Sequence, residues 1–180
     1  MLPTSRLGTL LIVTLLGTAV AVCAQEPRTH GTAAGLPATI HQLPLVESVG
    51  GDTAAGAIDR LHGTAVAPVT SAVGLYGSHG LQATLYLSRY ASDEDADAAL
   101  TAMAARLSEG TPEFGHHETQ QIVNTEVHRV FGLRQVHYVF LRERDLLWLA
   151  VPLQLARVGL ADLLDVPADS VPPLEVPPGR

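Results

Sequence analysis

The sequence contains no lysine, and its 11 basic residues are all arginines. This absence excludes a P-loop lysine, a Schiff-base lysine and a lysine general base. The basic residues are outnumbered by 18 acidic ones, the formal net charge is -7, and no run of basic residues is present. Binding to a phosphate backbone requires clustered positive charge, so the composition argues against a nucleic-acid partner.

Cysteine and aromatic residues are also scarce. Cys23 is the only cysteine, which excludes an internal disulfide and a multi-cysteine zinc site. All aromatic residues lie between Tyr76 and Trp148. Because aromatic side chains contribute the largest burial energies, this interval is expected to hold the core. A chain of 180 residues has room for one domain.

An apolar segment at the start of the chain predicts export. No charged residue occurs from Leu7 to Val22, and small residues follow the leucine-rich part. This pattern is typical of a secretory signal over residues 1–24 that is cleaved after Ala24, and it predicts a secreted or periplasmic protein. Two alternatives stay open: an uncleaved membrane anchor, and a lipoprotein signal with the lipid on Cys23.

Two segments of biased composition flank the predicted domain. Residues 25–45 are rich in Thr, Ala, Gly and Pro and lack aromatic residues, which predicts a flexible linker. Residues 166–180 contain repeated proline, which forbids a continued helix or an inner strand and predicts a disordered, Pro-rich tail. A single folded domain is therefore expected over residues 46–165.

Apolar periodicity predicts the elements of this domain. The clearest strand is Leu81–Tyr90, in which apolar and polar residues alternate. The clearest helix runs from its cap, Ser92, to Glu109, with carboxylates in its first turns. The other predicted elements are strands at Val69–Tyr76, Glu126–Phe131, Gln135–Leu141 and Leu146–Val151, a helix at Leu153–Leu164, and a weaker helix from Asp52 to Leu61.

The order of the secure elements, β-β-α-β-β-β-α, predicts an α+β fold. Strands joined by short turns favour an antiparallel sheet, and two amphipathic helices suit one covered face. We therefore predict a two-layer sandwich with both helices on the same face of the sheet. In this arrangement the apolar side of Leu81–Leu87 faces the helix stripe from Ala96 to Leu107.

The usual signatures of catalysis are missing from the sequence. It has no Gly-x-Ser-x-Gly elbow and no His-Glu-x-x-His motif. The acidic run Asp93–Asp97 lacks the glycine and glutamate of a calcium loop, and Gly51–Gly56 lacks the lysine of a phosphate loop. Ser78 and His79 are neighbours without an evident third partner. The pair His116-His117 lies in a polar connection, where paired histidines can contribute to a metal site or a pH response but are more often solvated.

One group of residues in the predicted sheet points to metal chemistry. A two-residue turn at Gly132-Leu133 places His128 opposite His137, whereas a four-residue loop makes them diagonal neighbours on the same face. Glu126 points to that face as well, because it lies two residues before His128. Two imidazoles and a carboxylate suit zinc or another divalent transition metal. The alternative is a polar cluster that faces solvent on the uncovered side of the sheet.

Three segments of the chain resemble uncharacterised exported bacterial domains of unknown function. They are Tyr76–Gly80, Tyr90–Ala96 and Gly132–Tyr138. The resemblance implies a strand, an acid-capped helix and a glycine-aromatic hairpin. It implies no catalytic residues.

These observations predict a non-catalytic binding or accessory protein of the cell envelope that needs no cofactor. The expected partner is an envelope protein or a small ligand, and contact with a membrane is expected only through the export signal. The alternative function is that of a metal-dependent hydrolase or metal-binding protein, which uses a zinc-type metal on the histidines of the sheet.

Overall fold

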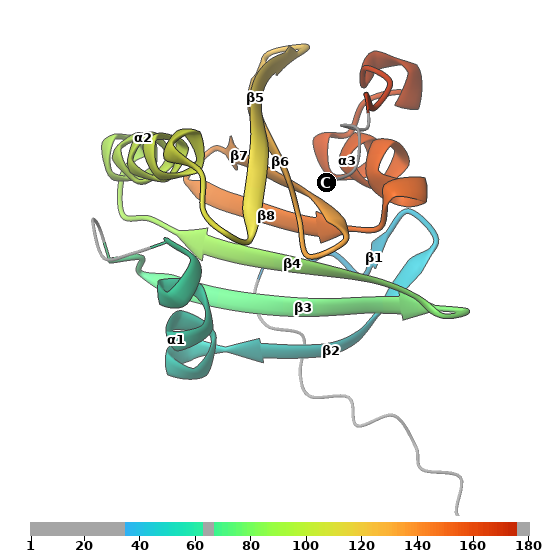
Figure 1. Ribbon diagram of the computed structural model, residues 1–180. Helices are drawn as coiled ribbons and strands as arrows, with labels where there is room; N and C mark the ends of the chain where they lie inside the picture. Colours follow the sequence, from blue (N-terminus) through green and yellow to red (C-terminus); the bar gives the residue numbers. More distant parts are fainter. Residues whose placement is uncertain (1–34, 63–66, 176–180) are drawn as a thin grey trace, which may run out of the picture.

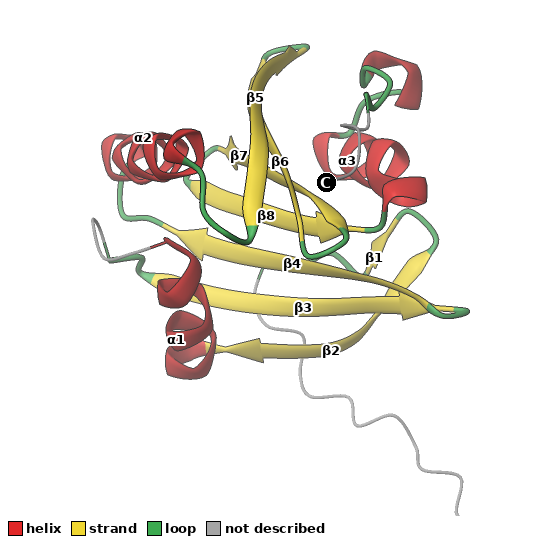
Figure 2. Ribbon diagram, viewed as in Figure 1, coloured by secondary structure: helices red, strands yellow, loops and turns green. Residues whose placement is uncertain are grey.

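The computed structural model describes residues 35–62 and 67–175, so the predicted export signal lies outside the described residues. In this part of the chain, eight strands form one antiparallel sheet on which three α-helices pack (Figures 1 and 2). The strands are β1 Thr39–Ile40, β2 Leu43–Gly50, β3 Thr70–Ser78, β4 Leu81–Arg89, β5 Phe114–Ile122, β6 Thr125–Gly132, β7 Gln135–Arg142 and β8 Asp145–Val151. The α-helices are α1 Gly51–His62, α2 Asp93–Glu109 and α3 Ala156–Leu164, and short 3-10 helices occupy Leu153–Leu155 and Ala168–Ser170.

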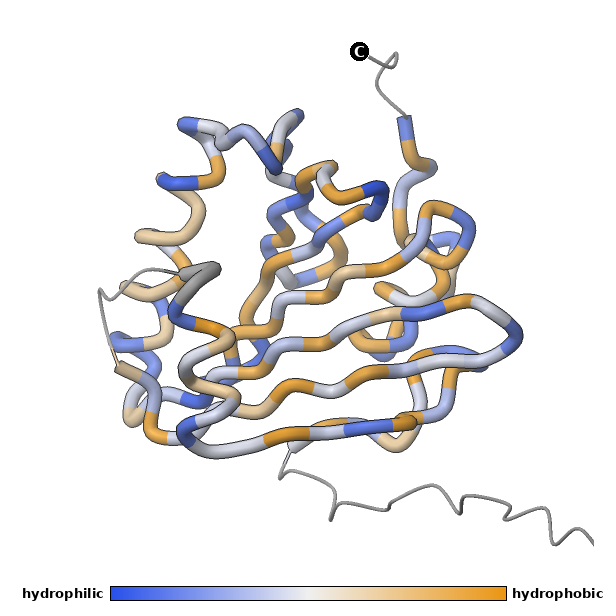
Figure 3. Tube along the Cα trace, turned by 60° about the horizontal axis from the view of Figure 1, so that its bottom comes forward, coloured by the Kyte–Doolittle hydropathy of each residue, from blue (hydrophilic) through white to orange (hydrophobic). Residues whose placement is uncertain are grey.

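The sheet is strongly curled. Its strand order is β1-β2-β3-β4-β8-β7-β6-β5, which leaves β5 at one edge. The twist between neighbouring strands accumulates across the sheet, so β5 rises steeply across the direction of β3 and β4 (Figure 1). Hydrophobic residues recur along the strands in Figure 3. Consecutive residues of β7 and β8 are buried, so alternate side chains of these strands enter two separate cores, one on each side of the sheet.

We name the two faces of the sheet after the helices that cover them. On the α3 face, Leu85 and Tyr138 of the sheet pack in one cluster with Leu160 of α3. On the α2 face, Trp148 packs in a second cluster with Met103 of α2. Helix α1 covers another part of the α2 face, where its Ala54 and Ile58 pack on Val73.

The predicted two-layer sandwich is wrong, because helices cover both faces of the sheet. The apolar side of β4 packs on the α3 face, with Leu85, whereas the stripe of α2 packs on the opposite face beside Tyr86. The central strands explain the error. All seven residues of β8 are buried, so this strand has no polar side, and a single covered face cannot bury it.

Three strands were not predicted: β1, β2 and β5. Strand β5 carries the sequence FGHHETQQI, in which only the last residue is fully buried. An edge strand exposes much of its surface, so it lacks the apolar alternation by which inner strands are detected. The order of strands and helices therefore differs from the predicted one.

The folded unit is longer than residues 46–165 at both ends. Ile40 and Leu43 are 1% and 3% exposed, and the hydroxyl of Tyr76 donates a hydrogen bond to the carbonyl oxygen of Pro37 at 3.0 Å. Residues 36–45, which lie within the predicted linker, therefore belong to the folded unit. In the predicted tail, Val171 is buried, and the arginine Nε of Arg157 donates to its carbonyl oxygen at 2.7 Å.

Candidate functional site

The three residues of the predicted metal site do share one face of the sheet, but not in the predicted register. Gly132 pairs with Gln135, so the turn is Leu133-Arg134, and His128 and His137 become diagonal neighbours. Their face is the covered α2 face and not an open one, because His128 and His137 are 4% and 3% exposed.

His137 is held by hydrogen bonds at both ring nitrogens. The indole Nε1 of Trp148 donates to Nδ1 of His137 at 2.9 Å. The other nitrogen, Nε2, is therefore the protonated one, and it donates to the carbonyl oxygen of Gly132 at 3.0 Å. Burial lowers the pKa of His137 to about 4, although the bond to Gly132 opposes this shift. The ring is thus a neutral structural group without a free nitrogen for a metal.

The predicted trio of Glu126, His128 and His137 is therefore not brought together as a metal site. Among residues 35–62 and 67–175, no three His, Cys, Asp or Glu side chains are grouped so that they could hold a metal ion. Glu126 does contact His128, with its Oε1 3.2 Å from Nε2 of the imidazole. The contact is not a hydrogen bond, and the buried Nε2 of His128 has no hydrogen-bond partner.

Gly132 allows β5 to begin very close to β6. A Cβ at this position would lie 2.3 Å from the carbonyl oxygen of Glu113 and 2.4 Å from the ring of Phe114. The ring of Phe114 packs edge-on against His137 and Trp148, with centroids 4.9 Å and 5.6 Å away. Gly132 is therefore required for close packing, whereas the turn itself uses Leu133 and Arg134 with φ of 50° and 63°.

The substitution Gly132→Ala is expected to lower the free energy of unfolding by about 1–3 kcal/mol, because the added methyl group forces backbone and ring apart. Urea titration followed by circular dichroism measures the loss. Gly115→Ala, in the same pair of strands, is the matched control: its Cβ would meet nothing within 4 Å, so a change within about 0.5 kcal/mol is expected. Equal losses in the two variants would contradict the proposed role of Gly132.

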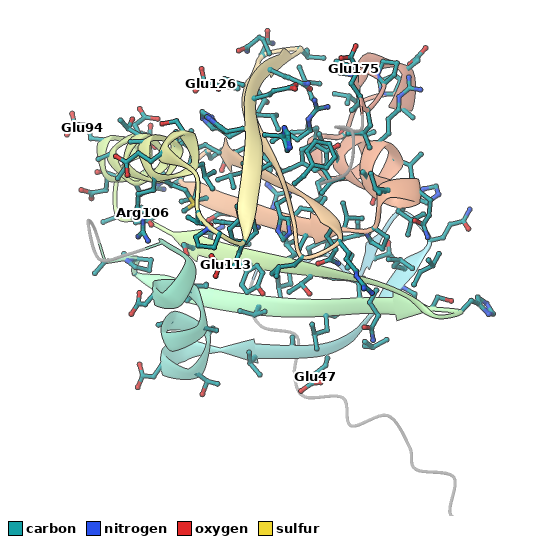
Figure 4. All side chains as sticks on the ribbon, in the orientation of Figure 1. Glu47, Glu94, Arg106, Glu113, Glu126 and Glu175 are labelled. Atoms are coloured by element: carbon teal, nitrogen blue, oxygen red, sulfur yellow. The ribbon has the colours of Figure 1, made fainter. Side chains whose placement is uncertain are left out.

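A pocket of about 160 Å³ lies where α2 ends and β5 begins. The aromatic side chains of Phe114 and Trp148 and the apolar side chains of Met103 and Leu107 line it. Its polar lining residues are Arg106, Thr111 and Glu113. In Figure 4, Glu113 lies at the foot of β5 and Arg106 lies below α2. The bond between Trp148 and His137 fixes the indole in this wall.

A second group of polar side chains surrounds His128, higher on the same face. The pairing of β5 with β6 shifts between Gly115 and Glu118, and His116 has a φ of 56° inside this bulge. A bulge re-aims the residues that it contains. It brings Nε2 of His117 to 3.2 Å from Nδ1 of His128. The hydroxyl of Thr119 also lies 3.2 Å from that Nδ1.

The two histidines and the nearest ion pair lie on opposite faces of the β5–β6 hairpin. Burial lowers the pKa of His117, and the neighbouring His128 lowers it further. Glu118 forms an ion pair with the buried guanidinium of Arg129, whose strand partner Tyr138 belongs to the α3 face. Glu118 is therefore directed away from the two histidines.

Sequence reasoning missed Phe114 and Thr119, and it considered His117 only as half of a loop pair with His116. All of these residues lie in the polar connection that did not have the pattern of a strand. The adjacent histidines were the available signal, but the structure separates them, because His116 packs edge-on against Phe131 at 6.5 Å while His117 contacts His128. A bulge has no pattern of its own in the sequence, so their different directions were not predictable.

Comparisons of the chain with protein-family models, with curated proteins and with solved structures found no match. No helix of the described residues is long and apolar enough to cross a membrane. Function is therefore inferred from the geometry of the pocket and of the histidine pair.

Proposed function

We propose that this domain is a non-catalytic binding protein of the cell envelope and that the pocket between α2 and β5 holds a small ligand. The carrying observation is a preformed pocket in which two aromatic and two aliphatic side chains meet one arginine. Ligand sites are usually concave and mostly apolar, with a few placed polar groups. The location in the envelope follows from the predicted export signal and stays a prediction.

The pocket favours a ligand with one ring-sized apolar group and one negative charge. Its volume of about 160 Å³ is close to that of an apolar cavity that holds a benzene ring. Arg106 is exposed, and in the described part of the chain it forms no ion pair, so its guanidinium is available to a carboxylate. The carboxylate of Glu113 opposes a second negative charge on the ligand.

The lining favours binding over catalysis. Arg106 and Glu113 are the only ionisable side chains among the lining residues. His137 contacts Trp148 and Phe114, two of the lining residues. Both of its ring nitrogens are engaged in hydrogen bonds. General acid–base catalysis requires a group that can exchange a proton with the substrate, which His137 in this position cannot do.

Titration with benzoate and with benzyl alcohol tests the proposal. The two probes share a ring, but only benzoate carries a charge for Arg106. Trp148 is the only tryptophan of the chain and lines the pocket, so its fluorescence reports occupation directly. We expect both probes to produce a saturable change, with tighter binding of benzoate.

Three variants make the titration specific for the pocket. Arg106→Gln should weaken benzoate binding about two- to fivefold, since an exposed ion pair contributes up to about 1 kcal/mol, and should leave benzyl alcohol unchanged. Arg134→Gln, in the β6–β7 turn, is the matched control and should change neither affinity. Leu107→Phe should fill the pocket and weaken both probes. Absence of saturable binding to the wild type, or an unchanged affinity in Leu107→Phe, would overturn the proposal.

A further inference from the structure

His117 and His128 form a polar cluster that the proposed pocket does not use. His117 is half-buried on the edge strand β5, and His128 is 4% exposed on β6. Their facing nitrogens, Nε2 of His117 and Nδ1 of His128, lie 3.2 Å apart. Thr119, whose hydroxyl reaches the same Nδ1, is exposed, so the cluster is accessible from solvent.

The separation of the two nitrogens matches that of two ligands on one metal ion. Zinc binds histidine nitrogen at about 2.0–2.1 Å with tetrahedral angles, so two nitrogens on one zinc ion lie about 3.3 Å apart. The two rings are within 18° of parallel, with centroids 5.3 Å apart, so the half-buried ring of His117 must rotate to direct both lone pairs to a common point. The hydroxyl of Thr119 and water would occupy the remaining positions.

Glu126 adds a second feature of metal sites. Histidines that bind a metal through one nitrogen usually donate the other N–H to a carboxylate, which sets the tautomer and raises the basicity of the ligand. Oε1 of Glu126 lies 3.2 Å from Nε2 of His128, and this buried Nε2 has no hydrogen-bond partner. The Glu126 side chain is 56% exposed, so it is free to turn and accept the N–H when a metal binds the other nitrogen. A proton on Nε2 leaves Nδ1 as the free ligand atom, which is the nitrogen that faces His117.

The bulge in β5 supplies a third observation. A non-glycine residue with positive φ is unfavourable, and His116 adopts this conformation where the register shifts. The result is that His117 is directed at His128 while its neighbour packs on Phe131. Bulges are frequent beside functional sites, where they re-aim one side chain.

We infer that His117 and His128 together bind one divalent transition-metal ion of the zinc type, with Glu126 as the carboxylate behind His128. This site replaces the predicted trio, because His117 takes the place of the structural His137. Glu126, which contacts His128, lies beside the upper part of β5 in Figure 4, away from Glu113 at the foot of β5 and from Arg106 below α2.

Calorimetric titration of the metal-free full chain with zinc chloride tests the inference. We expect one zinc ion per chain. His117→Gln should lower the affinity at least tenfold, whereas His116→Gln, the adjacent control, should leave it unchanged. Glu126→Gln should lower it about tenfold or more through loss of the supporting carboxylate.

Nitrogen-detected NMR of the histidine rings in the wild type gives a readout that is independent of the variants. Zinc should shift Nε2 of His117 and Nδ1 of His128 and leave both nitrogens of His137 in place. The inference would be overturned by an absence of saturable binding, by full affinity in a folded His117→Gln variant, by an equal loss in His116→Gln, or by zinc shifts confined to other histidines. Simple hydrogen bonding between the two rings predicts the first of these results.

Discussion

Replacement of Trp148 by alanine is expected to lower the free energy of unfolding by about 3–5 kcal/mol. Trp148 is 2% exposed and lies on β8, a central strand whose residues are all buried. The substitution leaves a cavity under α2. It also removes the indole N–H that donates to Nδ1 of His137, and this buried acceptor then loses its hydrogen bond.

Chemical denaturation followed by circular dichroism measures this loss, since the variant has no tryptophan fluorescence. Trp148→Phe is the matched variant, because it keeps an aromatic ring and removes the N–H group. It should be less destabilising than the alanine substitution. A loss below about 1 kcal/mol in Trp148→Ala would show that α2 and the sheet do not depend on this contact.

Acidification is expected to destabilise the domain by about 3 kcal/mol through His137 alone. Its pKa is about 4 in the folded protein, compared with about 6.5 in the unfolded chain. Between these values the unfolded chain binds a proton that the folded protein does not bind. The contribution of neutral His137 to the free energy of unfolding is therefore fully present above about pH 6.5, and it is lost as the pH is lowered towards 4. The lowered pKa of His117 acts in the same direction.

Urea titrations at a series of pH values separate the contribution of His137. In His137→Gln the decrease of stability between about pH 6.5 and 4 should be smaller by most of this 3 kcal/mol, because the variant has no proton to bind. His79→Gln, in the β3–β4 turn, should retain the slope of the wild type. Identical slopes in the wild type and in His137→Gln would show that His137 titrates normally in the folded protein.

The sequence was sufficient to predict a helix or strand where that element is specified by its own residues. Helix α2 begins at the predicted cap, where the hydroxyl of Ser92 accepts a hydrogen bond from the backbone N–H of Asp95 at 3.1 Å. The predicted apolar stripe, with Ala96, Met103 and Leu107, is the buried side of this helix. The alternation of β4 likewise predicts which of its side chains enter one core, although not which helix covers that core.

The pocket and the histidine cluster could not be predicted from the residues next to them in the sequence. A glycine between two strand patterns is typical of a turn, yet Gly132 allows the close approach of Phe114, and the turn begins one residue later. A polar connection suggested a loop, yet it is the edge strand that carries His117. In both cases the deciding contact is made by a distant segment.

The sequence by itself determined the acidic composition, the scarcity of residues for common chemistry, helix α2 and the inner strands, because these follow from residue types and their spacing. Only the tertiary structure decided that helices cover both faces and that His137 bonds to Trp148 while His117 meets His128. Strand order, register and the bulge in β5 determine these contacts. They depend on packing between segments far apart in the chain, for which no single segment carries a pattern.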